Sequence, residues 1–262
     1  MRDGVVLNDQ EIELELSIVM PCLNEAETLG NCIRKAQNFL NTFNIRGEIV
    51  IGDNGSVDGS ADIALKLGAR VVLVPARGYG AACFYASQAS RGTYIVLGDS
   101  DESYDFEDLM PFLEKMRSGS ELVIGNRFRG GIKKGAMPWK NRHIGNPLLT
   151  GAGRLLFSTK IGDFHCGLRG YSRAAFEKME LRSVGMEFAS EMIVRSQLHG
   201  LSIDEVPTTL SPDGRSRRSH LRPWRDGLRH LWLMIYLKLH SIIRNFVHRK
   251  KYVQSNAARP TF

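Results

Sequence analysis

Short runs of aliphatic and β-branched residues alternate with longer segments of helical periodicity through the first half of the chain. The runs lie at 16–22, 48–52, 70–74 and 93–98, and the helical patterns lie at about 25–43, 58–67 and 78–90. This alternation is typical of βαβ units, whose strands form a parallel sheet with helices on its faces. The sequence therefore predicts an α/β fold with a mainly parallel central sheet flanked by helices.

The second half of the chain is less regular. Apolar spacing predicts strands at 122–125 and 203–206, helices at 106–117, 141–157 and 187–199, and a Gly- and Lys-rich loop at 129–140. We expect four regions: an N-terminal extension (1–15), a globular α/β domain (16–211), a basic loop (212–223) and a long helix with a basic tail (224–262).

Positive charge is concentrated toward the end of the sequence. Residues 214–251 contain eleven Lys or Arg and one acid, Asp226, whereas the whole chain has a net charge of +7. Apolar residues recur there at helical spacing, at Leu228, Leu231, Trp232, Ile235, Leu239, Ile242, Ile243 and Phe246. The pattern predicts an amphipathic basic helix that contacts an anionic surface or substrate.

Targeting signals and cysteine chemistry limit the expected location. The first sixteen residues carry several acids and no apolar segment of the kind found in secretory signals. The longest strongly apolar run, at 231–237, is far shorter than the roughly 20 residues of a membrane-spanning helix. Four scattered cysteines form no C-x-x-C pair. We expect a cytoplasmic protein with reduced thiols and no spanning helix.

Acidic residues follow two of the predicted strands. Asp53 directly follows the second predicted strand, and Asp99-Ser100-Asp101 follows the fourth. In open α/β sheets ligands bind beyond the carboxyl ends of the strands. Two carboxylates one residue apart suit Mg²⁺ or Mn²⁺, which take oxygen ligands and bind phosphates. A solvated turn is the alternative, because Asp and Ser are common turn residues.

Two further motifs favour the ligand site. Pro21-Cys22-Leu23-Asn24-Glu25 follows the first predicted strand, and Asp53-Asn54-Gly55-Ser56-Val57-Asp58-Gly59 follows the second. With Asp99-Ser100-Asp101, these segments resemble the family 2 glycosyltransferases, which implies the GT-A (Rossmann-like) fold and makes 16–211 the catalytic domain. Asn54 departs from the family pattern, which commonly has a second aspartate there.

The resemblance implies a nucleotide-sugar donor site. Its implied contacts are Pro21, Leu23, Glu25, Asp53, Asn54, Ser56, Asp99 and Ser100, with Asp99 and Asp101 as ligands of the metal. Arg77, just before the glycine turn Gly78-Tyr79-Gly80, is a further candidate, since helix N-termini bind anions. For Asp58 we favour a simple helix-capping role.

Four other segments resemble the polyprenyl- or dolichyl-phosphate sugar synthases. They are 99–106, Gly125-Asn126-Arg127-Phe128, 165–171 and 212–217. This resemblance implies inverting transfer of a hexose from a donor such as GDP-mannose or UDP-glucose to a polyprenyl or dolichyl phosphate. It implies that Arg127, Arg142, Arg215 and Arg217 contact the acceptor phosphate, with Arg215 and Arg217 closing over the donor phosphates as well. It also implies that Asp101, Asp163 and Arg127 act in catalysis.

Several alternatives stay open. A hydroxyl acceptor on a glycan or glycolipid would need a general base, for which Asp163 is the candidate. The C-terminal helix binds the cytoplasmic face of an anionic membrane, packs on the domain, or joins a second copy in a homo-oligomer. A nucleic-acid-binding protein is the rival of another class. We expect no nucleic acid, because the basic region has little aromatic platform beyond Trp224.

Overall fold

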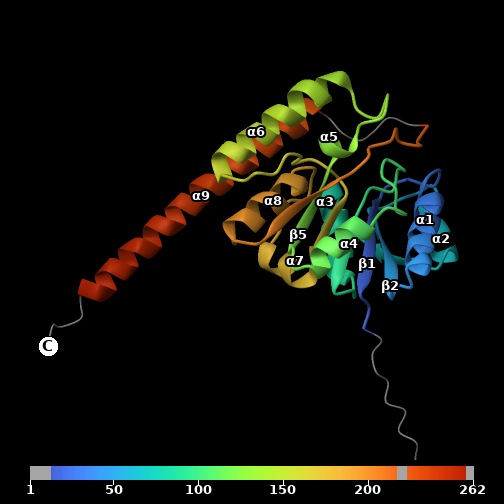
Figure 1. Ribbon diagram of the computed structural model, residues 1–262, viewed down its shortest axis with the longest axis horizontal. Coiled ribbons are helices and arrows are strands. Elements are labelled where there is room, and N and C mark those ends of the chain that lie inside the picture. Colours follow the sequence, from blue (N-terminus) through green and yellow to red (C-terminus); the bar gives the residue numbers. More distant parts are fainter. Residues whose placement is uncertain (1–12, 217–222, 258–262) are drawn as a thin grey trace, which may run out of the picture.

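The computed structural model describes residues 13–216 and 223–257, and a single seven-stranded sheet organises them (Figure 1). The strands are β1 (Leu16–Cys22), β2 (Gly47–Asp53), β3 (Arg70–Leu73), β4 (Tyr94–Leu97), β5 (Leu122–Asn126), β6 (Arg169–Ser172) and β7 (Ile203–Pro207). Their order is β3-β2-β1-β4-β6-β5-β7, and only β6 pairs antiparallel to its neighbours. The predicted α/β fold with a mainly parallel sheet is confirmed.

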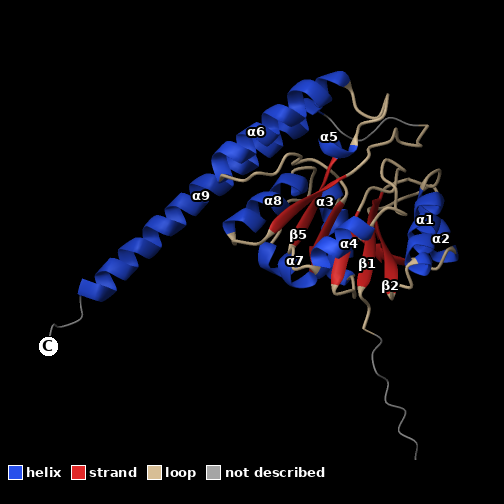
Figure 2. Ribbon diagram, in the orientation of Figure 1, coloured by secondary structure: helices blue, strands red, loops and turns tan. Residues whose placement is uncertain are grey.

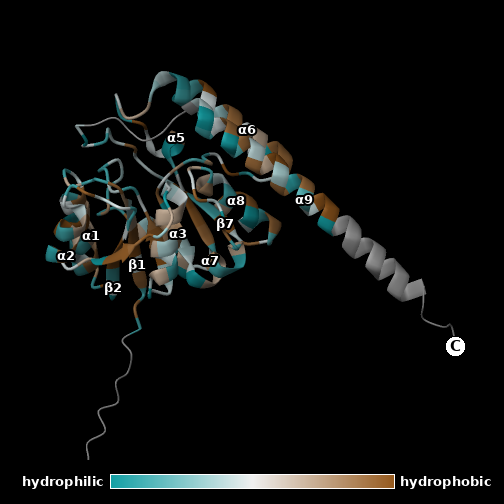
Figure 3. Cartoon of the chain, turned by 180° about the vertical axis from the view of Figure 1, so that it is seen from behind, coloured by the Kyte–Doolittle hydropathy of each residue, from teal (hydrophilic) through white to brown (hydrophobic). Residues whose placement is uncertain are grey.

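Helices cover both faces of this sheet. They are α1 (Leu29–Thr42), α2 (Ser60–Lys66), α3 (Tyr79–Ala89), α4 (Met110–Arg117), α5 (Arg127–Gly130), η1 (Asn141–Gly145, a π-helix), α6 (Asn146–Phe157), α7 (Arg173–Met179), α8 (Phe188–Leu198) and α9 (Pro223–Ala257). Figures 1 and 3, drawn from opposite sides, place α4 over one face and α3 over the other. A sheet covered on both faces explains why all seven residues of β1 are buried.

The strand order reverses beside β1. The chain runs outward from β1 through β2 to β3 and then returns to β4 on the other side of β1. Because the connections between parallel strands are right-handed, this return places α3 on the opposite face from α1. The carboxyl ends of β2, β1 and β4 therefore lie side by side at a switch point, where open α/β sheets bind ligands (Figure 2).

The sequence did not predict β6 and α7, and several helix starts differ from the expected ones. β6 has only four residues and contains Arg169 and Gly170, so it lacks the apolar run of a central strand. Arg169 is buried, and its guanidinium donates hydrogen bonds to three backbone carbonyls, those of Phe164, Cys166 and Ala189. The helix expected from residue 25 begins at Leu29, because residues 25–28 form a turn first.

Helices α6 and α9 lie side by side and extend beyond the body of the protein (Figures 1 and 3). The helix expected at 224–248 is α9, which spans Pro223–Ala257. The helix expected at 141–157 is divided into η1 and α6, with Pro147 in the first turn of α6. None of the helices in the described ranges is long and apolar enough to cross a membrane. The four cysteines are buried and free.

Candidate functional site

The loops after β1, β2 and β4 are joined to one another by hydrogen bonds. The Ser100 hydroxyl donates to the carbonyl of Pro21 at 2.7 Å, and the Thr28 hydroxyl donates to the carbonyl of Ser100 at 2.7 Å. The backbone N of Asn54 donates to the carbonyl of Cys22 at 2.9 Å. The three motifs of the sequence thus form one polar site at the switch point.

Asp53 and Asn54 make the hydrogen bonds that organise the loop after β2 and join it to the segment at 76–78. The Asp53 carboxylate accepts from the backbone N of Gly55 and of Ser56 at 3.2–3.3 Å, and Gly55 has φ +90°. The Asn54 amide donates to the carbonyl of Ala76 and accepts from the backbone N of Gly78, both at 2.8 Å. Asn54 therefore holds the segment that carries Arg77, whose side chain is exposed.

Ser56 and Asp58 connect this loop to the one after β1. The Ser56 hydroxyl accepts from the backbone N of Asn24 at 2.9 Å, and the Asp58 carboxylate accepts from the backbone N of Ala26 and of Ser60 at 3.0 Å. Both side chains therefore shape the loops. The helix-capping role expected for Asp58 is wrong in its position, because the N-cap of α2 is Gly59 and Asp58 lies one residue before it.

The carboxylates of Asp99 and Asp101 have different surroundings. Asp99 accepts from the Tyr79 hydroxyl at 2.8 Å, and burial together with the charge of Asp101 raises the pKa of Asp99 to about 6. A Cβ at Gly167 would collide with Asp99 Oδ2, so this carboxylate lies against bare backbone. Asp101 accepts from the backbone N of Ser103 at 3.0 Å. Tyr79 and Gly167 were not among the predicted site residues, although both stand in motifs that the sequence singled out.

A segment far along the chain closes over Asp101. Arg215 pairs through Nη2 with Asp101 Oδ2 at 2.7 Å and with Asp213 at 3.0 Å, and through Nη1 with Glu25 Oε1 at 3.2 Å. Its side chain is 9% exposed, so the guanidinium is enclosed among these carboxylates. Arg217, predicted to act with Arg215, lies outside the described residues.

The chemistry of these groups fits a divalent cation. The carboxylates of Asp99 and Asp101 are oxygen donors of the kind that Mg²⁺ and Mn²⁺ prefer, and the Arg215 guanidinium already places positive charge against Asp101. Within 13–216 and 223–257, no three His, Cys, Asp or Glu residues are arranged to hold a metal on their own. A cation here would need further ligands, such as the oxygens of a diphosphate.

The predicted acceptor side contains a buried ion pair. The Arg127 guanidinium donates to the Asp163 carboxylate through Nε at 2.7 Å and Nη2 at 2.8 Å, and Asp163 is fully buried. The sequence did not predict that these two residues are partners. Arg142 stands apart on η1 with an exposed side chain, which makes no hydrogen bond or ion pair with the described part of the chain.

Two histidines connect α9 to this region. The rings of His165 and His230 meet edge to face at 4.6 Å between centroids, and Ser190 Oγ lies 2.8 Å from His230 Nδ1. Burial and the nearby Arg169 lower the pKa of His230 to about 4. Cys166, which follows His165 in the sequence, is fully buried.

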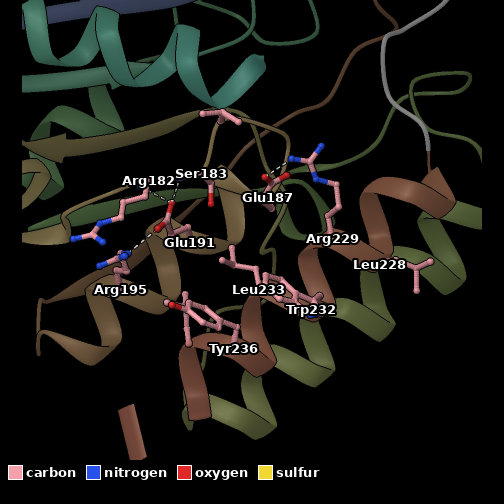
Figure 4. Close-up of a pocket in the computed structure, with 12 residues that line it drawn as sticks. Arg182, Ser183, Glu187, Glu191, Arg195, Leu228, Arg229, Trp232, Leu233 and Tyr236 are labelled. Carbon is pink, nitrogen blue, oxygen red and sulfur yellow. Dashed lines mark hydrogen bonds and ion pairs between the residues drawn. The ribbon is translucent and has the colours of Figure 1, made fainter. Parts of the chain in front are cut away.

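A groove of about 570 Å³ lies between α8 and α9 (Figure 4). One wall carries Glu191, which accepts from Arg195 Nε at 2.7 Å, and the other carries Arg229, which donates to Glu187 at 2.7 Å. Exposed apolar side chains of α9 complete the wall, at Leu228, Trp232 and Tyr236. The Arg–Glu pairs cancel most of the charge of the groove, which leaves its apolar wall as its main chemical feature.

Comparisons with known proteins identify the family of this chain. Residues 17–180 match the model of glycosyl transferase family 2. A low-salt glycan biosynthesis hexosyltransferase of Haloferax volcanii is 41% identical over 228 residues, which cover 87% of this chain and 54% of that protein. The chain thus spans about half the length of this relative. A dolichyl-phosphate hexose transferase of the same organism is 32% identical over 216 residues, which cover 81% and 89% of the two chains.

Solved structures share the fold. Glucosyl-3-phosphoglycerate synthase from Mycobacterium tuberculosis, in complex with Mn²⁺, uridine diphosphate and glucosyl-3-phosphoglycerate, superposes with a TM-score of 0.63 at 21% identity, covering 86% of this chain and 80% of that one. The GT-A-like fold predicted from the motifs is confirmed. The family match over most of the sheet, together with relatives that cover four fifths of the chain or more, establishes that this protein belongs to glycosyl transferase family 2.

Proposed function

We propose that the protein transfers a hexose, with inversion, from a nucleotide sugar of the GDP-mannose or UDP-glucose type to a polyprenyl or dolichyl phosphate. The observation that carries the proposal is the placement of Asp53 at the end of β2 and of Asp99 and Asp101 after β4, on either side of β1 at the switch point of the sheet. The relative named as a dolichyl-phosphate hexose transferase supports the acceptor class. The solved neighbour that contains Mn²⁺ and uridine diphosphate supports a nucleotide donor.

In this proposal the donor nucleotide lies over the loops after β1 and β2. Pro21, Leu23, Glu25, Asp53, Asn54, Ser56 and Arg77 surround its base, ribose and phosphates, with Ser100 beneath them. Asp99 and Asp101 would hold Mg²⁺ or Mn²⁺, which when bound neutralises the charge that develops on the leaving diphosphate. The hydrogen bonds among the loops keep the two carboxylates in place before the donor arrives, so that binding requires little reorganisation.

A phosphate acceptor agrees with the pairing of Asp163. A lipid phosphate arrives ionised, so the reaction requires positioning and charge screening and no strong general base. A fully buried carboxylate that holds a guanidinium at 2.7–2.8 Å is poorly placed to remove a proton from a hydroxyl group. We therefore assign Asp163 the role of positioning Arg127 at the acceptor side, with Arg142, Arg215 and Arg217 as further contacts of phosphates.

The C-terminal helix supports peripheral attachment to a membrane. Exposed apolar residues of α9 recur at helical spacing, at Leu228, Trp232, Ile235, Leu239 and Ile242, whereas Asp226, His230, Met234, Leu237 and Ser241 on the other side are buried. An apolar face with basic neighbours suits the anionic cytoplasmic surface of a membrane. We thus propose 16–211 as the catalytic domain, 212–223 as the basic loop that closes over the donor and acceptor phosphates, and 224–262 as the membrane-proximal region.

Membrane attachment is tested with vesicles. We expect the protein to sediment with vesicles of phosphatidylserine and phosphatidylcholine and to be released by high salt, because basic contacts are screened. Trp232→Glu should lower this binding, and Leu65→Glu, at an exposed apolar position of α2, is the matched control. Unchanged sedimentation of the Trp232 variant, or a dimer in analytical ultracentrifugation that this substitution dissociates, would favour a second copy as the partner of α9.

A panel of donors tests the reaction itself. The protein is incubated with radiolabelled nucleotide sugars, Mg²⁺ or Mn²⁺ and polyprenyl phosphate, and the lipid product is extracted into organic solvent. Asp101→Asn should abolish the product, and Asp105→Asn, an exposed carboxylate of the same loop paired with Lys35 at 3.4 Å, should not. The absence of lipid-linked product with every donor would reject the lipid phosphate acceptor.

A second candidate keeps the donor and changes the acceptor. The relative that is 41% identical is named for glycan biosynthesis, which supports a hydroxyl group on a glycan or glycolipid as the acceptor. The same panel is therefore run with glycan and glycolipid acceptors. Transfer to these and not to polyprenyl phosphate would favour the second candidate. Binding of DNA at physiological salt, without donor hydrolysis, would instead favour the nucleic-acid-binding alternative.

A further inference from the structure

Residues 211–216 form a strap across the donor side of the site. The backbone N of Ser211 donates to the carbonyl of Ser103 at 2.9 Å, and the backbone N of Gly214 donates to the carbonyl of Asp101 at 2.9 Å. At the other end, the backbone N of Ser216 donates to Glu27 at 2.8 Å. The strap is therefore tied both to the loop of the metal-binding carboxylates and to the turn that precedes α1.

Gly214 lets the strap approach this closely. A Cβ at this position would meet the carboxylate of Glu102 and the methyl group of Thr28, so a larger residue would require the Glu102 side chain to move. Arg215 follows directly and reaches inward. Its guanidinium lies between Glu25 at 3.2 Å and Asp101 at 2.7 Å, with Asp213 at 3.0 Å.

Arg215 and a divalent cation would compete for the same oxygen. Nη2 of Arg215 is 2.7 Å from Asp101 Oδ2, whereas Mg²⁺ and Mn²⁺ sit about 2.0–2.2 Å from the oxygens that bind them. Two cations cannot both approach one oxygen so closely without strong repulsion, and the low exposure of Arg215 leaves little water to screen it. The cation would therefore have to displace the guanidinium from Asp101.

We propose that Arg215 is a positioning residue that serves as a built-in counter-ion in the donor-free protein and is displaced from Asp101 when the metal and the donor diphosphate bind. The proposal rests on the proposed function, because it requires a metal–diphosphate donor. The displaced guanidinium remains close to the site, since the strap is anchored on both sides of it, and it pairs with the diphosphate oxygens. The strap thereby makes the binding of metal and nucleotide mutually dependent.

This arrangement has two measurable consequences. The metal alone binds weakly, because it must break the ion pair at Asp101 and leaves the guanidinium without an equivalent partner. The metal with a nucleoside diphosphate binds more tightly, because the phosphates accept the displaced guanidinium. Removal of Arg215 should therefore tighten the binding of the metal alone and weaken the binding of the metal in the presence of a nucleoside diphosphate.

Calorimetric titration with Mn²⁺ measures both equilibria. We expect Arg215→Gln to bind Mn²⁺ alone about tenfold more tightly than the wild type, from the loss of one charged hydrogen bond that competes for Asp101. With saturating UDP or GDP the order should reverse, and the variant should bind more weakly. Arg215→Lys keeps the charge and loses the bidentate contact, so its Mn²⁺ affinities should lie between those of the wild type and those of Arg215→Gln.

Two further variants keep the test decisive. Asp213→Asn leaves Glu25 and Asp101 intact but removes a partner that the displaced guanidinium would keep, so it should weaken binding of Mn²⁺ alone by about two- to threefold, and it tests the proposal even if Arg215→Gln fails to fold. Arg117→Gln, at an exposed pair with Glu15 just before the amino end of β1, is the control and should change nothing.

The outcomes separate this proposal from the proposed function. If the wild type binds Mn²⁺ with nucleotide and neither Arg215→Gln nor Asp213→Asn changes the affinity for Mn²⁺ alone, the counter-ion proposal is wrong and the donor site stands. If neither nucleotide allows Mn²⁺ to bind the wild type, the metal-dependent function fails and the counter-ion proposal fails with it.

Discussion

Replacing Asp163 by Asn distinguishes a structural role of this carboxylate from a catalytic one. The buried carboxylate accepts from Arg127 at its backbone N (3.1 Å), Nε (2.7 Å) and Nη2 (2.8 Å), and from the backbone N of His165 (3.1 Å). An Asn side chain has one acceptor oxygen and turns an amide donor toward one of these donors. The positive charge of Arg127 would then be buried without a counter-ion. Removing one partner of a buried ion pair costs about 3–5 kcal/mol.

Urea unfolding followed by circular dichroism measures this cost. We expect Asp163→Asn to lower the free energy of unfolding by about 3–5 kcal/mol. The double variant Arg127→Gln/Asp163→Asn should be less destabilised than the sum of the two single variants by about 2 kcal/mol, because neither partner then leaves an isolated charge. A stability within about 1 kcal/mol of the wild type, with turnover abolished and donor binding intact, would refute this reasoning and identify Asp163 as the base for a hydroxyl acceptor.

Three further predictions concern the surroundings of the site. Gly167→Ala should weaken Mn²⁺ binding in the presence of nucleotide by about tenfold or more, because the added methyl group displaces the carboxylate of Asp99; isothermal titration measures this, and an unchanged affinity contradicts it. His230 is buried with its pKa lowered to about 4, so unfolding takes up a proton below pH 6.5. The free energy of unfolding should therefore fall by up to about 3 kcal/mol as the pH drops from 6.5 to 4. His230→Gln should flatten that part of the pH profile of urea unfolding, and an equally steep profile would reject the assignment. Asn54→Asp, which restores the residue common in the family, should destabilise the fold by about 1–3 kcal/mol, because a carboxylate would face the carbonyl of Ala76; thermal unfolding at neutral pH tests this, and an unchanged or higher melting temperature would contradict it.

The sequence was sufficient to predict the strands that form the site. β1, β2 and β4 are buried on both faces and read as apolar runs, so their positions and the acidic residues after them could be predicted. β6 could not, because Arg169 interrupts its apolar pattern and is buried with its guanidinium bound to backbone carbonyls, which no side-chain pattern in the sequence indicates. Local periodicity carries no signal for such a strand.

Site residues next to the predicted strands could be found from the sequence, whereas their partners far away in the sequence could not. Asp53, Asp99 and Asp101 follow strands directly, so their convergence could be deduced from the sheet alone. The partners of these residues come from elsewhere in the chain: Arg215 is 114 residues from Asp101 in sequence. An arginine in a basic segment looks like a solvated charge, and nothing in its neighbourhood indicates that three carboxylates enclose it.

This difference determines how the basic residues are interpreted. Read from the sequence, Arg127 and Arg215 are cations available for phosphates, whereas in the folded chain each is held by carboxylates. The two pairs differ in one respect that matters for function. Asp163 is fully buried and has no exposed route to a ligand, so the Arg127 pair is suited to hold the acceptor side in shape. Asp101 lies at a strand end beside Asp99, where a stronger cation can take the place of the guanidinium. Of the two arginines, Arg215 is therefore the one whose partner should change when the donor binds.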